Sequence, residues 1–335
     1  MNTVYVPHDY KSVLSLYETQ TAIGIINRTF EDFLALRLRL KRVSAPLFVD
    51  PQTGLNDNLS GVERPVRFEI PATGSDAEVV HSLAKWKRMA LYRYDFHAGK
   101  GIYANMNAIR RDEELDNLHS IYVDQWDWEK VITRADRTEE YLKQTVRSIV
   151  SCVCDTLDVI KDRYESVGIE LCREVSFVSS QELEDMYPKM TSKERENAYL
   201  AEKKTAFIMC IGEKLKSGKP HDSRSPDYDD WSLNGDLMFY DELLGCAMEL
   251  SSMGIRVDSK SLGEQLTKAC CDDRRKLLYH KMLLKDELPL TIGGGIGQSR
   301  LCMLLLEKAH IGEVQSSIWD EQSMKTCKEA NIILL

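Results

Sequence analysis

The sequence lacks the features that mark membrane, zinc-binding and repeat proteins. No run approaches the roughly 18 apolar residues of a membrane span, and residues 1–14 hold no apolar core of the signal-peptide type. No Cys-x-x-Cys pair occurs and the seven histidines lie far apart, so a zinc site finds no support. No internal repeat or low-complexity linker interrupts the chain. We therefore expect a cytoplasmic protein with no membrane partner and one continuous α+β domain.

An excess of positive charge is also missing. Lys and Arg number 44 against 53 Asp and Glu, which gives a net charge of -9 without a basic half or tail. This balance argues against nonspecific nucleic-acid binding as the main activity, and we expect no nucleic-acid partner. A hydrophobic content of 43% and a charged content of 29% are typical of a soluble globular protein. The nine cysteines, mostly among apolar neighbours, are predicted to be reduced core residues.

The most informative stretch is TIGGGIGQSR, residues 291–300. Its glycines let a backbone pass close to a flat or charged ligand, and Ser299-Arg300 places a guanidinium at the opening of a helix. The stretch fits neither GxGxxG, because Arg300 stands at the third glycine position, nor a P-loop, because no Gly-Lys-Ser/Thr follows. A tight turn before a core helix is the alternative. The stretch is therefore a candidate nucleotide site.

Hydrophobic periodicity predicts the elements around this stretch. One long helix or two abutting ones in residues 11–40 lead into an extended, Pro-bearing segment, which is a candidate subunit interface or an ordinary surface element. A hairpin with a charged tip is expected over residues 101–128. The other expected strands cover 65–70, 77–80, 175–178, 206–211, 246–256 and a segment that begins at 234, and the other expected helices cover 83–88, 138–167, 258–270 and 274–285, with short ones from 180 and 192.

Three groups of charges have two interpretations each. Ser82 is predicted to cap a helix whose three cations, within residues 85–88, form a solvated face or bind an anion. The carboxylates of SPDYDDW, residues 225–231, are expected in a loop, either solvated or holding a cation or an amine. Glu249 interrupts an apolar strand. Because an isolated buried carboxylate is costly, Glu249 should be paired or metal-bound.

These parts match the needs of bound ATP. A bent ATP needs one guanidinium on the α-phosphate, carboxylates that hold Mg²⁺ against the phosphates, and a second guanidinium on adenine or the γ-phosphate. Arg110 at the hairpin, Asp236 and Glu249 on strands, and Arg300 after a Gly-rich turn supply them. The pattern resembles the class II aminoacyl-tRNA synthetase catalytic fold. The resemblance implies an α+β fold, with an antiparallel sheet flanked by helices.

Eight segments resemble, more narrowly, the ammonia-dependent asparagine synthetases, or aspartate-ammonia ligases. They run in one order from Asn56 to Gln315: NDNLSG, EVVHSLAKWKR, LHSIYVDQWDWE, SPDYDDW, LNGD, ELSSMGIRVD, TIGGGIGQSR and HIGEVQ. The resemblance implies a homodimer in which residues 1–335 form a single catalytic domain, with ATP, Mg²⁺, aspartate and ammonia as reactants and cofactor. The β-carboxylate of aspartate would attack the α-phosphate of ATP, releasing pyrophosphate, and ammonia would then displace AMP to give asparagine.

The resemblance also implies roles for individual residues. Arg110 and Gln125 would stabilise charge at the α-phosphate. Asp57 would attract ammonium and accept its proton, because ammonium is not a nucleophile. Lys87 and Arg256 suit the α-carboxylate of aspartate. Weaker candidates for the other polar groups of aspartate are Ser82, Asp127, Asp229, Ser251 and Ser252.

The nucleotide would be held by a second set of residues. Those expected to bind it, besides Arg110, are Leu118, His119, Ser120, Ile121, Asp236, Glu249, Gly295 and Arg300. The backbone of residues 118–121 would border adenine, and Asp236 and Glu249 would hold Mg²⁺, through the phosphates, or the ribose.

Three other interpretations remain. A tRNA synthetase would use the same apparatus, but no appended domain or basic surface is evident. A noncatalytic protein on this fold has no need for Arg110, Glu249 and Arg300 together. Glutamine as nitrogen donor usually requires a nucleophilic cysteine near a processed N-terminus, whereas the first cysteine here is Cys152. Free ammonia is therefore the predicted donor.

Overall fold

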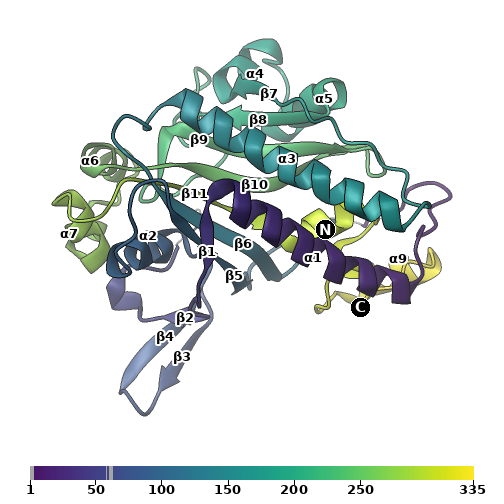
Figure 1. The fold of residues 1–335 in the computed structure, drawn as a ribbon, viewed down its shortest axis with the longest axis horizontal. Helices are drawn as coiled ribbons and strands as arrows, with labels where there is room; N and C mark the ends of the chain where they lie inside the picture. The colour runs from purple at the N-terminus through teal and green to yellow at the C-terminus, as the bar shows by residue number, and fades with distance from the viewer. Residues whose placement is uncertain (1–3, 58, 60–62) are drawn as a thin grey trace.

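The computed structural model describes residues 4–57, 59 and 63–335, and an eight-stranded sheet forms its body (Figure 1). In spatial order the strands are β1 (Leu40–Arg42), β5 (Gly101–Ile109), β6 (Tyr122–Val131), β11 (Thr291–Gly297), β10 (Cys246–Arg256), β9 (Asp229–Asp241), β8 (Thr205–Met209) and β7 (Ser176–Ser179). The pairs at the two edges, β1–β5 and β7–β8, are parallel, and the pairs between them are antiparallel. The mostly antiparallel α+β architecture agrees with the prediction.

Helices flank this sheet, and a second, smaller sheet projects from the body (Figure 1). The helices are α1 (Leu16–Leu38), α2 (Ala84–Arg93), α3 (Glu139–Arg163), α4 (Ser180–Met186), α5 (Ser192–Lys203), α6 (Ser259–Lys268), α7 (Leu278–Leu284), α8 (Gln298–Leu305) and α9 (Glu321–Glu329), with 3₁₀ turns η1 (Pro51–Thr53), η2 (Asp272–Lys276) and η3 (Ile311–Glu313). The small sheet has the order β2 (Phe48–Val49), β4 (Ser75–Val79), β3 (Arg67–Ile70). In the part of the chain that the structure describes, no helix combines the length and the apolar character needed to cross a membrane.

The main core lies between one face of the large sheet and helices α1, α3 and α8. Helix α1 is a single helix that begins with a capping box between Ser15 and Glu18. Its residues Ile26, Phe30 and Leu34 recur at helical spacing and are buried. The ring of Phe30 lies 4.7 Å from that of Trp126 on β6. This face of the sheet is therefore apolar.

Strand β6 separates apolar from polar side chains. Trp126 and Trp128 belong to the core under α1 and α3. Gln125, Asp127 and Glu129 alternate with them and so point to the opposite face. One face of β6 therefore packs into the apolar core, and the other face is polar.

The glycine stretch forms strand β11 in the centre of the sheet, and the expected turn was wrong. A Cβ at Gly293 would lie 2.0 Å from Glu129 Oε2, and one at Gly295 would lie 2.4 Å from Gln125 Oε1. The glycines thus leave room for polar side chains of the neighbouring strand, rather than providing unusual backbone angles. Helix α8 begins immediately after Gly297 and carries Arg300 in its first turn.

Three other predictions about local structure were wrong. Helix α2 has Leu83 as its N-cap, and the hydroxyl of Ser82 donates instead to Asp57 Oδ2 at 3.1 Å. The three cations of residues 85–88 are buried rather than solvated. Strand β9 begins at Asp229, earlier than expected, so that Asp229 and Asp230 are buried strand residues. Lys85, Lys87, Asp229 and Asp230 are each buried against an oppositely charged partner distant in the sequence, and Arg88 is buried against the Pro289 and Val257 carbonyls.

Candidate active site

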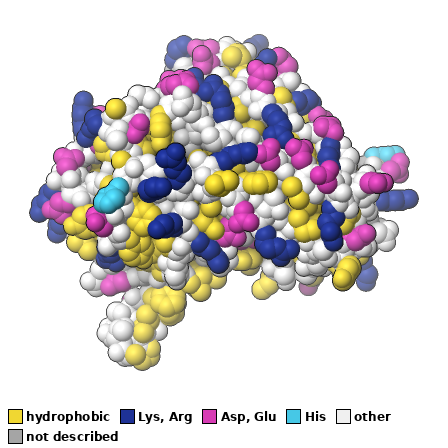
Figure 2. All heavy atoms as spheres, viewed as in Figure 1, with side chains coloured by type: hydrophobic (Ala, Val, Ile, Leu, Met, Phe, Trp, Pro, Cys, Tyr) yellow, Lys and Arg dark blue, Asp and Glu magenta, His cyan; other side chains and the backbone are white. Residues whose placement is uncertain are grey.

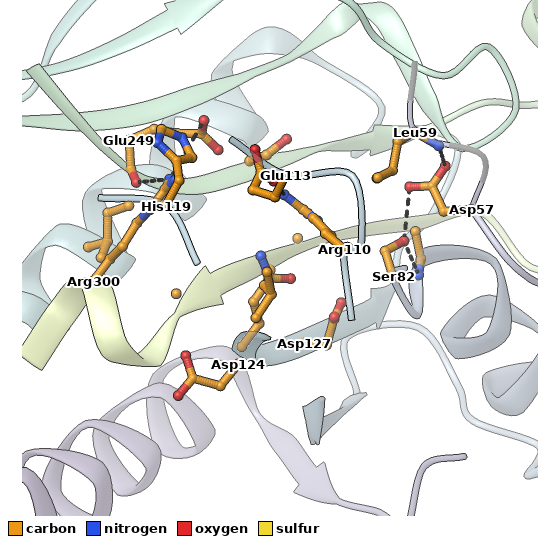
Figure 3. Close-up of a pocket in the computed structure, with 18 of the residues that line it drawn as sticks. Asp57, Leu59, Ser82, Arg110, Glu113, His119, Asp124, Asp127, Glu249 and Arg300 are labelled. Atoms are coloured by element: carbon orange, nitrogen blue, oxygen red, sulfur yellow. Dashed lines mark hydrogen bonds and ion pairs between the residues drawn. The ribbon is translucent and has the colours of Figure 1, made fainter. Parts of the chain in front are cut away.

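A cavity of about 420 Å³ opens on the polar face of the large sheet (Figure 3). Its walls come from β6, β10 and β11, from the starts of α2 and α8, and from the loops that precede them. The residues predicted for the site that line it are Asp57, Ser82, Lys87, Arg110, Leu118, His119, Ser120, Gln125, Asp127, Asp229, Glu249, Ser252, Arg256, Gly295 and Arg300. Residues dispersed over 244 positions of the chain, from 57 to 300, thus share one cavity.

Three predicted site residues do not line this cavity. Ser251 alternates with Ser252 on β10 and so lies on the face of the apolar core. The carbonyl of Ile121 accepts a hydrogen bond from the Arg110 N–H at 2.8 Å and closes the hairpin. Asp236 is paired with Arg224, and Arg224 rather than Asp236 lines the cavity.

Asp57 lies at one margin of the cavity with both carboxylate oxygens engaged. Oδ2 accepts from Ser82 Oγ at 3.1 Å, and Oδ1 accepts from the Leu59 N–H at 3.0 Å (Figure 3). The side chain is buried. Of the predicted NDNLSG segment, Asn58, Ser60 and Gly61 lie outside the described residues.

A lattice of ion pairs forms one end of the cavity, which we call the paired end: Lys87, Asp127, Glu129, Asp229 and Arg256. Lys87 pairs with Asp127 and donates to the Gly294 carbonyl at 3.0 Å. Arg256 donates to both oxygens of Glu129, at 2.8 and 3.0 Å, and pairs with Asp229. Burial acts to raise the pKa of Glu129, but the charge of Arg256 and its hydrogen bonds lower it overall. Burial lowers the pKa of Lys87 and raises that of Asp229.

Arg110, Glu249 and Arg300 form a second, more exposed group of charges, which we call the open end; in Figure 3 Glu249 and Arg300 lie together, and Arg110 lies between them and Asp57. Arg110 lies 3.9 Å from Glu113, and Arg300 lies 4.0 Å from the carboxylate of Glu249 while donating to its backbone carbonyl at 2.8 Å. Burial acts to raise the pKa of Glu249, but the charges of Arg300 and other cations lower it overall. These side chains are positioned without strong pairing, which leaves their charges available to a ligand.

Sequence reasoning missed Arg224, which lines the cavity. Its guanidinium donates to Ser252 Oγ and, at 2.5 Å, to Asp236 Oδ1. Burial raises the pKa of Asp236 to about 7, although Arg224 acts against that rise. Other lining residues that were missed include Asp124, Tyr228, Ser299 and Gln315. These four residues lie within the segments LHSIYVDQWDWE, SPDYDDW, TIGGGIGQSR and HIGEVQ, so the resemblance could have identified them, whereas Arg224 lies outside all of the quoted segments.

A buried cluster supports the wall that carries Arg224 and Tyr228. Asp227 accepts from Lys85 at 3.1 Å, from Arg274 at 3.0 Å and from His280 at 2.9 Å. The carboxylates of residues 225–231 were predicted to be solvated or to hold a cation or an amine. Asp227 holds cations, namely the side chains of Lys85 and Arg274. Within residues 4–57, 59 and 63–335, no three His, Cys, Asp or Glu side chains come together as metal ligands.

The fold matches solved synthetase structures. The asparaginyl-tRNA synthetase from Entamoeba histolytica, in complex with asparaginyl-adenylate, superposes with a TM-score of 0.66 at 13% identity, over 90% of this chain and 66% of that one. The corresponding enzyme from Pyrococcus horikoshii gives a TM-score of 0.66 at 16% identity, over 89% and 68%. At these identities the likeness concerns the fold alone, and it confirms the predicted class II synthetase-like architecture.

Sequence comparison identifies the family. The profile for aspartate-ammonia ligases matches residues 17–331. The aspartate–ammonia ligase of Clostridium tetani is 59% identical over 331 residues, covering 98% of this chain and 97% of its own. That of Clostridium perfringens SM101 is 58% identical over 336 residues, covering 100% of both. This chain belongs to the aspartate-ammonia ligase family.

Proposed function

We propose that the protein makes L-asparagine from L-aspartate, ammonia and ATP through a β-aspartyl-adenylate, with release of AMP and pyrophosphate. The observation that carries this proposal is one cavity with an ion-paired end and an open cationic end, in a chain that aligns end to end with ligases of this name. A carboxylate is a poor electrophile until its oxygen becomes part of a leaving group, and AMP is that leaving group. Residues 1–335 act as one catalytic domain.

The paired end binds aspartate. Lys87 and Arg256 hold the α-carboxylate, and Asp127 and Asp229 hold the α-ammonium. In the part of the chain that the structure describes, Oδ2 of each of these two aspartates has no hydrogen-bond partner, which supports this role. Ser82 and Ser252 line the same region and contribute hydroxyls. Because the lattice is already formed, binding requires little reorganisation of charge.

Adenylation takes place between the two ends. Arg110 and Gln125 donate to the α-phosphate as charge develops on it, and preorganised donors of this kind contribute roughly 10²- to 10³-fold each. The neighbouring synthetases from Entamoeba histolytica and Pyrococcus horikoshii hold an acyl-adenylate on the same fold, which supports this assignment. The aspartate β-carboxylate then forms a bond to the α-phosphorus while the bond to the pyrophosphate oxygen breaks.

Ammonia enters at the margin formed by Asp57. The Asp57 carboxylate attracts ammonium and accepts its proton, so that neutral ammonia attacks the acyl carbon. The carbon–oxygen bond to AMP then breaks, the attacking nitrogen loses a second proton to solvent, and asparagine remains. The hydrogen bonds from Ser82 and Leu59 orient the carboxylate for this role.

The open end binds the nucleotide. The backbone of residues 118–121 borders adenine, Gly295 admits the nucleotide without a Cβ, and Arg300 holds it. Mg²⁺ prefers oxygen ligands and often takes only one or two carboxylates beside the phosphates, so Glu249 fits as a ligand. Asp236 fits as a second carboxylate, for the ion or for ribose, when Arg224 turns from it towards a phosphate. The ion would neutralise charge on the phosphates.

The ligase is also proposed to be a cytoplasmic homodimer. Helix α1 leaves Tyr17 and Leu36 exposed, and the following segment exposes Leu47 and Phe48. Phe48 and Phe68 pack edge to face on the small sheet, and Figure 2 shows hydrophobic side chains on this projection. Such apolar surface supports an interface. Sedimentation equilibrium would give twice the chain mass, whereas the single-chain mass would contradict the dimer.

The function is tested by the products formed from aspartate, ammonium, ATP and Mg²⁺. The proposal predicts asparagine, AMP and pyrophosphate in equal amounts. ADP and phosphate would indicate an acyl-phosphate route and overturn the site assignment. Glutamine in place of ammonium should fail to support asparagine formation, and transfer of aspartate or asparagine to tRNA would favour the synthetase alternative.

A further inference from the structure

Asn56, which precedes the proposed ammonia residue Asp57, is buried and uses both ends of its amide. Asn56 Oδ1 accepts from the backbone N–H groups of Asp57 at 3.0 Å and His81 at 2.9 Å. Its Nδ2 donates to Glu78 Oε2 at 3.0 Å and to the Val79 carbonyl at 3.3 Å. One side chain therefore joins the backbone of Asp57 to the end of strand β4.

The attachment continues into the small sheet. Glu78 is buried, and its second oxygen accepts from Arg67 Nε at 2.8 Å on the neighbouring strand β3. His81 closes the loop from the other side, because its Nδ1 lies 3.2 Å from the Asp57 carbonyl oxygen. The Asp57 carbonyl thus contacts a residue that follows β4, and the Asp57 N–H is bonded to Asn56, whose amide is itself bonded to Glu78, Val79 and His81.

The hydrogen bonds of Asn56 involve the residues proposed for the ammonia step and not those proposed for nucleotide binding. Ser82, which orients the Asp57 carboxylate, follows His81 directly, so Asn56 fixes both the residue and the donor that aims it. Among the described residues, the four hydrogen bonds of the Asn56 side chain reach Asp57, Glu78, Val79 and His81, and none reaches Arg110, Glu249 or Arg300. A displacement of Asn56 should therefore slow the ammonia step more than it impairs nucleotide binding.

We propose that Asn56 is a positioning residue for the ammonia step, and that the small sheet, through Glu78, is the support against which it holds Asp57. The inference rests on the proposed role of Asp57. A misplacement of about 1 Å in a reacting group can cost about 10²-fold in rate, so loss of this amide is expected to impair amide formation strongly.

The test compares two reactions in Asn56→Asp. This variant keeps the acceptor for Asp57 and His81 but places a second carboxylate against Glu78. We expect a fall of about 10²-fold in ammonium-dependent asparagine formation, with aspartate-dependent exchange of pyrophosphate into ATP close to wild type. Hydroxylamine, which is uncharged at neutral pH, should be used with a smaller loss than ammonium, because it needs no proton acceptor before it attacks. Equal losses in all three assays would mean a merely structural role and overturn the inference.

A second variant tests the support. In Asn56→Asp/Glu78→Gln the amide and the carboxylate exchange places, so the hydrogen bond between the two residues is restored. Contacting residues couple, and we expect recovery of about tenfold in the ammonium-dependent rate. No recovery would contradict the role of Glu78.

The matched control is Asn234→Asp. Asn234 is equally buried and bonds the N–H and carbonyl of Ile211, each at 2.9 Å, away from Asp57. Its replacement should affect ammonium and hydroxylamine alike. Asp57→Asn separates the two proposals: if it retains full amide formation, the assignment of Asp57 fails, whereas if it loses amide formation and Asn56→Asp does not, only the positioning inference fails.

Discussion

The two ends of the cavity hold their charges in different ways. At the paired end, Lys87 and Arg256 are 1% and 2% exposed, and each already contacts a carboxylate. At the open end, the side chains of Arg110 and Arg300 are 27% and 21% exposed, and their nearest carboxylates are 3.9 and 4.0 Å away. Burial and close pairing therefore preorganise the end proposed for the small amino acid, whereas the end proposed for the polyphosphate keeps cations that are partly exposed and only weakly paired.

The largest effect is expected at the paired end. In Arg256→Met, Glu129 and Asp229 lose their guanidinium partner while they stay buried. Breaking a buried pair in this way typically costs about 3–5 kcal/mol of unfolding free energy. Urea unfolding should show that loss, and the KM for aspartate should rise. Wild-type stability in this variant would contradict the account of the paired end.

Arg110→Ala tests the open end. The rate of aspartate-dependent pyrophosphate exchange should fall roughly 10²- to 10³-fold, about 3–4 kcal/mol in activation free energy. The thermal midpoint should stay close to wild type, because Arg110 is partly exposed and weakly paired. The exposed neighbour Arg111 provides the control, since Arg111→Ala should change neither quantity. A large loss of stability in Arg110→Ala would remove the distinction between the ends.

A smaller effect is expected behind the open end, at His310. Burial lowers the pKa of this histidine to about 4 from its ordinary 6.5, and its Nδ1 accepts from the Gly312 N–H at 3.0 Å. Between these pH values the unfolded chain binds the proton and the folded chain does not. Acidification from pH 6.5 to 4 should therefore remove on the order of 3 kcal/mol of stability.

His310→Asn keeps an acceptor for Gly312 and removes the titrating group. Unfolding free energies measured between pH 6.5 and 4 should fall less steeply in this variant than in the wild type. Identical slopes would show that His310 does not carry this part of the pH dependence.

Much of the fold follows from local patterns. Hydrophobic periods of two and of 3.6 residues predict the β5–β6 hairpin and helices α1 and α3, respectively. Most residues that line the cavity lie in a few short motifs. Burial of the cations in residues 85–88 was missed because their partners are remote: Lys85 pairs with Asp227, 142 residues later. The local sequence alone predicts that a run of charges is solvated, because it does not contain the counterions that the fold brings to it.

The predicted site was incomplete for the same reason. Arg224 stands in a loop without any pattern, and only the packing of that loop against β9 and β10 brings it to Asp236 and Ser252. Ser251 was included with Ser252 although strand alternation separates their faces.

In the proposed reaction, the β-carboxylate of aspartate is activated by bonding to the α-phosphate of ATP. The most direct test supplies aspartate labelled with a heavy oxygen isotope in both β-carboxylate oxygens, together with ammonium, ATP and Mg²⁺, and then examines the products by mass spectrometry. The account predicts one labelled oxygen in the phosphate of AMP for each asparagine formed, which retains the other. Label in inorganic phosphate, or AMP without label, would contradict it.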